Sequence, residues 1–158
     1  MSNGVAAPSE EFSFASGEFD AAKYEGVARN ARLREVRLVN SAYAAKVMNF
    51  MLDGMEMKQS YHGAPSSHSF AQERGLVVGS YLWSAEVRAG RAKALKFSAE
   101  YMVAYSNLKD GPEDYVSLYF KKLARFTSYP YFRAHFAVHI AASGLMLPPL
   151  PSLTDRVD

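Results

Sequence analysis

Residues 95–106, LKFSAEYMVAYS, alternate apolar and polar side chains more clearly than any other stretch of this 158-residue chain. One face of the segment carries Leu95, Phe97, Ala99, Tyr101, Val103 and Tyr105, and the other carries Lys96, Ser98, Glu100 and Ser106. A period of two is typical of a β-strand, because successive side chains point to opposite sides of the sheet. The pattern therefore predicts an antiparallel sheet with one packed face and one wetter face.

Three further strands are predicted upstream, at roughly 33–39, 46–59 and 76–87. Gly54 interrupts the second of these and predicts a bulge or bend there. Gly90 lies in the turn that follows the third, where a hairpin needs a positive φ. Between them, residues 60–75 are polar and contain Gly, Pro and Ser, which predicts a long loop. Residues 1–20 are predicted as a mobile tail and residues 20–32 as a short helix.

After residue 106 the apolar period changes from two to about 3.6, which indicates helix. Pro112 and two acidic residues predict a helix start near residue 112, and the triplet at 127–129 predicts its end. Pro130 then opens a second helix, which Gly144 ends. Residues 145–151 must be extended and are predicted as a packed tail. The predicted fold is α+β, a four-stranded antiparallel sheet with two C-terminal helices packed on one face.

The composition excludes several classes of protein. The chain has no cysteine, which rules out disulfides and thiolate chemistry and suits a reducing compartment. The first residues lack the order of a signal peptide, and no apolar run approaches 18 residues, so we expect a cytoplasmic protein that does not insert into a membrane. Seven Met, ten Tyr and ten Phe provide much adaptable contact surface.

No catalytic motif is present, and we expect neither enzymatic activity nor a cofactor. His135 and His139 lie four residues apart, on one helical face, but a zinc site needs further ligands. We therefore expect a helix surface or an oligomer contact there rather than a metal site. The net charge is only +2, and Arg29, Arg32, Arg34 and Arg37 are better explained as a solvated face than as a nucleic-acid site.

The C-terminal half resembles the SecB family of protein-export chaperones. The segments that carry the resemblance are Tyr129-Pro130-Tyr131-Phe132-Arg133, Gly144 to Leu150 and, less strongly, Arg32 to Leu38. The chain looks most like the SecB-like chaperones found beside toxin–antitoxin pairs. The resemblance covers residues 31–153. It leaves residues 1–30 as a flexible N-terminal extension with a short helix, and residues 154–158 as a short tail.

The resemblance implies a homotetramer, a dimer of dimers, that binds unfolded polypeptide clients in apolar grooves without cofactor or nucleotide. The client-binding residues that it implies are Tyr43, Phe50, Met51, Met55, Met57, Phe136 and Met146. Met and aromatic side chains suit such a surface because they repack around many sequences. Apolar periodicity does not separate groove from core, so both interpretations stay open for each residue.

Two features differ from the export chaperones, which are acidic and carry a further C-terminal helix used for docking on the secretion ATPase. This chain has 18 Lys and Arg against 16 Asp and Glu, and only residues 152–158 follow its proline segment. We therefore expect weak or no binding to that ATPase. The leading hypothesis is an ATP-independent holdase. The alternatives are a dedicated chaperone of an antitoxin and, from another class, a basic nucleic-acid-binding domain.

Overall fold

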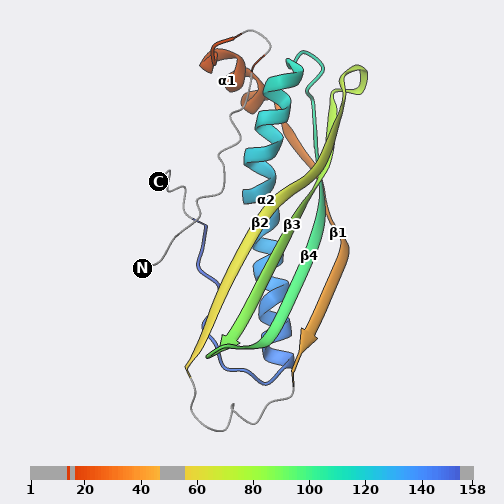
Figure 1. Cartoon of the computed structure of the whole chain (residues 1–158). Helices are drawn as coiled ribbons and strands as arrows, with labels where there is room; N and C mark the ends of the chain where they lie inside the picture. Colours follow the sequence, from red (N-terminus) through yellow and green to blue (C-terminus); the bar gives the residue numbers. More distant parts are fainter. Residues whose placement is uncertain (1–13, 15–16, 47–55, 154–158) are drawn as a thin grey trace.

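The structure, a computed structural model, describes residues 14, 17–46 and 56–153. In these residues, four strands, two α-helices and one 3-10 turn form an elongated body in which α2 lies along one face of the sheet (Figure 1). In chain order the elements are α1 (Ala21–Asn30), β1 (Arg32–Ala45), β2 (Met57–Ala71), η2 (Gln72–Arg74), β3 (Leu76–Ala89), β4 (Ala92–Ser106) and α2 (Glu113–Ala142).

The sheet is antiparallel throughout, with strand order β1-β4-β3-β2. The strand predicted from residues 95–106 is β4, which lies inside the sheet, and its apolar row is buried from Leu95 to Tyr105. The strand predicted at 76–87 is β3, and Gly90 has the positive φ of 60° that the β3–β4 turn needs. The alternation in both strands is confirmed, because one side of each is covered by α2 and the other is not.

The loop predicted at 60–75 is wrong, because β2 occupies most of that range as an edge strand. Its polar side chains did not suggest a strand, yet its backbone pairs with β3 from Met57 to Ala71. Pro65 is tolerated because it lies at an edge and beside a register shift, where a missing N–H costs little. The strand predicted at 46–59 falls largely on residues 47–55, outside the described part of the chain, and its last residues open β2.

The prediction of two C-terminal helices is also corrected: α2 is one helix of 30 residues with Pro130 inside it. The triplet at 127–129, expected to break the helix, instead contacts the sheet. The Ser128 hydroxyl donates to the carbonyl oxygen of Ala124 at 2.6 Å and accepts from the indole nitrogen of Trp83 at 2.8 Å. Thr127 forms a hydrogen bond with the Tyr105 hydroxyl. Tertiary contacts thus hold the backbone helical where propensity alone predicts an interruption.

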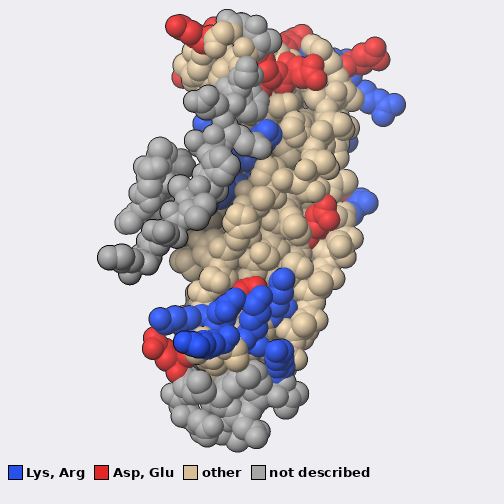
Figure 2. Space-filling model, in the orientation of Figure 1, with Lys and Arg blue, Asp and Glu red and all other residues tan. Residues whose placement is uncertain are grey.

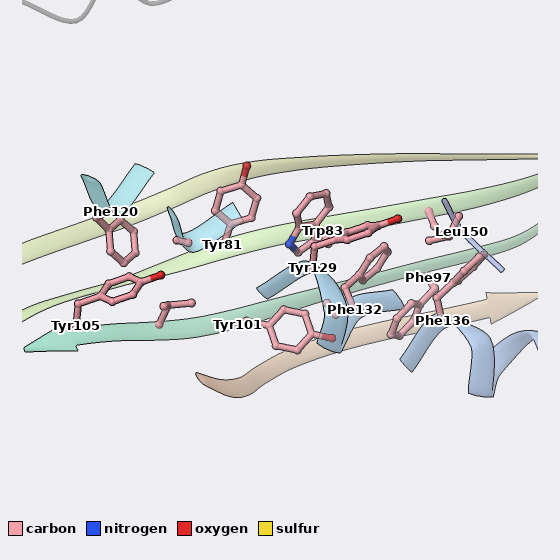
Figure 3. Packing of buried hydrophobic residues seen from close by; sticks show 14 of the residues in the cluster. Tyr81, Trp83, Phe97, Tyr101, Tyr105, Phe120, Tyr129, Phe132, Phe136 and Leu150 are labelled. Carbon is pink, nitrogen blue, oxygen red and sulfur yellow. The ribbon is translucent and has the colours of Figure 1, made fainter. Parts of the chain in front are cut away.

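The core is a row of aromatic rings between α2 and the strands (Figure 3). Trp83 on β3 packs on Tyr129 and Phe132, with ring centroids 5.0 and 5.7 Å apart, and Phe97 on β4 stacks on Phe132. Each such side chain contributes roughly 1.5–3 kcal/mol by leaving water. The predicted α+β class and the four-stranded sheet with helical cover on one face are confirmed.

The predicted N-terminal helix is confirmed as α1, which packs at the start of α2 (Figure 1). The Asp20 side chain caps it by accepting from the backbone of Ala22, and the Asp20 backbone N–H donates to the Tyr115 hydroxyl at 2.7 Å. Phe14 stacks on the same Tyr115 ring at 4.9 Å. Of the predicted tail, residues 1–13, 15 and 16 lie outside the described residues.

The segment after α2 is packed, as predicted. Gly144 has a φ of 76° and turns the chain back after the helix. Leu145 and Leu150 are buried in the core cluster, and Leu147 and Leu153 pack against it. We call residues 145–153 the C-terminal segment; it lies beside α2 and, through a hydrogen bond from Gln59 to Pro148, beside β2.

The exposed Pro130 provides a test of the continuous helix. We expect Pro130→Ala to raise the free energy of unfolding by about 1–2 kcal/mol. Alanine restores a helical hydrogen bond and relieves a clash worth about 3 kcal/mol, part of which is offset by greater entropy of the unfolded chain. Urea denaturation measures the change. Pro112→Ala, at the helix N-cap, is the control and should change stability by less than about 0.5 kcal/mol. A less stable Pro130→Ala protein would contradict this account.

Candidate functional site

Two apolar grooves adjoin along the second half of α2, where the C-terminal segment runs beside the helix. The first has a volume of about 470 Å³ and is lined by Phe126, Tyr129, Pro130, Arg133, Ala134, Ala137, Pro149, Ser152 and Leu153. The second has a volume of about 490 Å³ and is lined by Arg133, Phe136, Ala137, Ile140, Ala141 and Leu145 to Leu150. We call the pair the tail grooves. Arg133, Ala137 and Pro149 line both of them.

Small side chains on α2 leave the space for these grooves. The large aromatic residues of the helix, such as Phe132 and Phe136, are buried against the sheet. Ala134, Ala137 and Ala141 are exposed and recur at helical spacing on the side that meets the C-terminal segment. Because alanine fills little volume, the helix and the segment do not close on each other, and apolar walls face an open channel.

Side chains that donate to backbone carbonyls hold the C-terminal segment in place. The Tyr129 hydroxyl donates to Pro151, the Arg133 Nε donates to Leu150 at 2.6 Å, and the Gln59 Nε2 donates to Pro148 at 2.9 Å. Burial, with a smaller contribution from Tyr61, raises the pKa of Tyr129 to about 12, so its hydroxyl keeps its proton at neutral pH. The far wall of the grooves is thus fixed by polar contacts rather than by regular secondary structure.

Two of the predicted client-binding residues meet in the second tail groove. Phe136 is only 2% exposed and forms part of its floor, while Met146 is 98% exposed on the C-terminal segment. Phe136 is therefore both a core residue and a groove residue, and these are the two interpretations that the sequence left open.

Two further predicted client-binding residues, Tyr43 and Met57, do not join them. Tyr43 lies on edge strand β1, where its ring stacks on His139 at 4.6 Å. Met57 opens β2, on the opposite edge of the sheet, and packs half-buried against the core. Phe50, Met51 and Met55 lie outside the described residues. A role in client binding stays a prediction for all seven residues.

The histidines of α2 have contacts that need no metal. His135 Nδ1 forms a hydrogen bond with the Tyr101 hydroxyl at 2.6 Å, and His139 packs against Phe97 as well as Tyr43. Within residues 14, 17–46 and 56–153, no three His, Cys, Asp or Glu side chains gather as a metal site would require.

The helices of this part of the chain are too short or too polar to cross a bilayer.

Sequence reasoning missed Tyr129, Arg133 and the row of alanines as groove residues. The signals were present: small residues flank the apolar stripe of α2, and a leucine- and proline-rich segment follows the helix. What the sequence does not show is which side of α2 the C-terminal segment packs against. The side on which the segment packs depends on hydrogen bonds to backbone carbonyls, and the pattern of apolar and polar side chains does not predict these bonds.

Neither a family model nor a curated protein matches this chain. Among solved structures, it is similar to a SecB-like chaperone from Mycobacterium tuberculosis, solved in complex with a ChAD peptide from the HigA1 antitoxin. The TM-score is 0.68 at 16% sequence identity, over 86% of this chain and 99% of that one. A protein of unknown function from Streptococcus agalactiae matches with a TM-score of 0.31 at 11% identity, over 78% of this chain and 96% of that one. The SecB resemblance seen in the sequence is thus confirmed as a shared fold.

The contacts of the C-terminal segment can be tested one at a time. Tyr129→Phe keeps the ring on Trp83 but removes the donor to Pro151, and Arg133→Met keeps much of the apolar stem but removes the donor to Leu150. We expect each to lower the free energy of unfolding by about 1–2 kcal/mol and to speed amide hydrogen exchange in residues 145–153. Tyr131→Phe, on the exposed side of α2, is the matched control and should leave exchange unchanged. If residues 145–153 exchange their amide hydrogens at the same rate in all three variants, the segment is held by its leucines alone.

Proposed function

We propose that this chain is a dedicated chaperone that binds an apolar segment of an antitoxin in the tail grooves. The observation that carries the proposal is the fold shared with a SecB-like chaperone that was solved with an antitoxin peptide. The geometry of the grooves supports it independently, since they are open, apolar and bounded by an extended segment. Grooves that adjoin along one helix suit an extended polypeptide, because such a segment can contact both at once.

The grooves can supply affinity in the range that a reversible chaperone needs. Burying two or three Leu, Ile or Phe side chains contributes a gross 3–9 kcal/mol, at roughly 1.5–3 kcal/mol each. Ordering an unfolded segment costs about 2–5 kcal/mol or more of that gain. The net binding is modest for a short segment, so a client must present several apolar residues to be retained. This requirement favours an unfolded segment over a folded surface.

General holdase activity is the second candidate. Met146, almost fully exposed, and the alanine-lined walls favour it, because neither imposes a precise shape on the client. The two candidates differ in selectivity. A dedicated chaperone binds one antitoxin much more tightly than an unrelated unfolded protein, whereas a general holdase slows the aggregation of both without ATP.

A single substitution in the grooves tests the site. Ala137 lines both tail grooves and is exposed, so Ala137→Glu places a charge in the apolar channel without disturbing the core. We expect the dissociation constant for an antitoxin peptide, with the ChAD peptide of the HigA1 antitoxin as the probe, to rise at least about tenfold. The new carboxylate, even if it pairs with Arg133 four residues earlier, fills the apolar channel and must be desolvated when the peptide binds. Titration calorimetry measures it.

Ala142→Glu is the matched control, since Ala142 is exposed on the same helix but lines neither groove. It should change the dissociation constant by less than about twofold. If the Ala137→Glu protein binds the antitoxin as tightly as the native protein does, the tail grooves are excluded as the site. If the antitoxin does not bind, but the aggregation of an unrelated denatured protein is still slowed, the general holdase is the better function.

We also propose that the chain assembles as a homotetramer. Large apolar side chains are exposed on β1 and on α2, including Leu33 (53%), Val39 (51%) and Val138 (64%). Surface of this kind on an edge strand and a helix is usually covered by another subunit. Light scattering coupled to size exclusion should give four times the 17.5 kDa chain mass. A monomer at micromolar concentration would overturn the proposed assembly and weaken the chaperone proposal.

A further inference from the structure

The face of the sheet turned away from α2 has one strongly basic end. Figure 2 shows Lys and Arg side chains gathered there, over the ends of the strands. This basic end consists of Lys58 on β2, Arg88 on β3, Arg91 in the β3–β4 turn, and Lys93 and Lys96 on β4. All five residues are exposed.

The strand register places like charges directly opposite one another. Arg88 is paired with Lys58 on one side and with Lys93 on the other. Like charges at directly opposed positions destabilise a sheet. The Glu86 carboxylate relieves part of the repulsion, because its oxygens lie 3.0 Å from Lys93 Nζ and 3.4 Å from a guanidinium nitrogen of Arg88. The basic end is therefore a feature that costs stability in the free protein.

Within the part of the chain that the structure describes, the five cations outnumber the carboxylates beside them, which are Glu56 and Glu86. Lys58, Arg91 and Lys96 form no ion pair there, although Glu86 is the cross-strand partner of Lys96. A cavity of about 350 Å³, lined by Glu56, Lys58, Arg88 and Gly90, opens at the same place. A surface that concentrates cations in this way attracts an anionic partner and speeds its association.

We propose that the basic end binds an acidic, extended segment of a protein partner. The strands lie about 4.8 Å apart, so the three strands that carry the basic end span roughly 10 Å, which an extended segment of about three residues crosses. Carboxylates on such a segment and on the residues beside it would meet Lys58, Arg91 and Lys96 together. The same cations disfavour a basic partner on this face.

The surroundings of the basic end favour a protein over a nucleic acid. The aromatic residues of β3 and β4, including Tyr81, Trp83 and Phe97, all lie on the other face and are buried under α2. Single-stranded nucleic acid needs exposed rings on which its bases can stack. The open face instead carries Leu82 (46% exposed) farther along β3. Cations followed by an apolar side chain match a segment that combines acidic and apolar residues.

Fluorescence anisotropy with a defined probe tests the proposal. The probe is a labelled peptide of alternating Glu and Leu, about 12 residues long and so able to cross the whole basic end. The variant Lys58→Ser, Arg91→Ser, Lys96→Ser should weaken binding at least about tenfold. Raising the salt from about 0.05 to 0.3 M should weaken binding to the native protein as well, because exposed charges are screened.

The matched control is Arg34→Ser, Arg74→Ser, Lys109→Ser, which removes the same charge from exposed positions elsewhere. It should change peptide binding by less than about twofold. No binding of the peptide, or equal losses in the two triple variants, would overturn the proposal. An oligonucleotide that binds more tightly than the peptide, and loses its affinity only in the Lys58, Arg91 and Lys96 variant, would show that the basic end serves nucleic acid.

This test does not depend on the proposed chaperone function. Ala137→Glu, which disables the tail grooves on the other face, should leave binding of the acidic peptide unchanged. Loss of peptide binding in Ala137→Glu would place the peptide in the tail grooves and overturn the assignment to the basic end.

Discussion

The contact between Trp83 and α2 fixes how the helix lies on the sheet, and the rest of the structure depends on it. The Trp83 indole donates to the Ser128 hydroxyl at 2.8 Å, and its ring packs against both Tyr129 and Phe132. On its other side a Cβ at position 63 would lie 2.4 Å from the indole ring, so the edge strand must carry glycine there. One side chain therefore sets the rotation of the helix, its distance from the sheet and the glycine at position 63 of β2.

The rotation of α2 decides where the tail grooves form. With Phe132 and Phe136 directed into the sheet, the alanines at 134, 137 and 141 must lie on the outer sides of the helix. Continuity through Pro130 matters for the same reason, because a break there would free the second half of α2 to turn independently. The proline costs helical free energy, about 3 kcal/mol in an unsupported helix, and the aromatic packing on either side offsets it. The packing of the core and the shape of the tail grooves thus depend on the same rotation of α2.

The sequence predicts the parts of this fold that rest on local periodicity. The strands β3 and β4 are clear because the alternation of their side chains reports directly which face is buried. The edge strand β2 is predicted as a loop from residue 60 onward because its pairing is carried by the backbone, and Gly63 and Pro65 are poor strand formers elsewhere. Two helices were expected because residues 127–130 have low helix propensity, and their contacts with Trp83 and Tyr105 are not local.

The candidate site was only partly predictable, for a related reason. Phe136 and Met146 were identified through the family resemblance, and the structure brings them to one groove. Tyr43 and Met57 belong to opposite edges of the sheet, a separation that depends on the strand order and not on residue spacing. The roles of Tyr129 and Arg133 arise from carbonyl groups about 20 residues away, in a segment without regular structure. Side-chain pattern gives no information on such contacts.

The two proposed surfaces lie on opposite sides of one sheet and differ in their physics. The tail grooves bind through removal of apolar surface from water, which moderate salt changes little, whereas the basic end acts through exposed charges, which salt screens. Because the sheet separates them, both can be occupied at once without steric conflict. A partner that presents an apolar segment and an acidic segment, joined by a linker long enough to pass the sheet edge, would bind the second surface as an intramolecular event. Its affinity would then exceed that for either segment alone, by a factor set by linker length. Selectivity for one partner could thus arise from two surfaces that are each weakly selective by themselves.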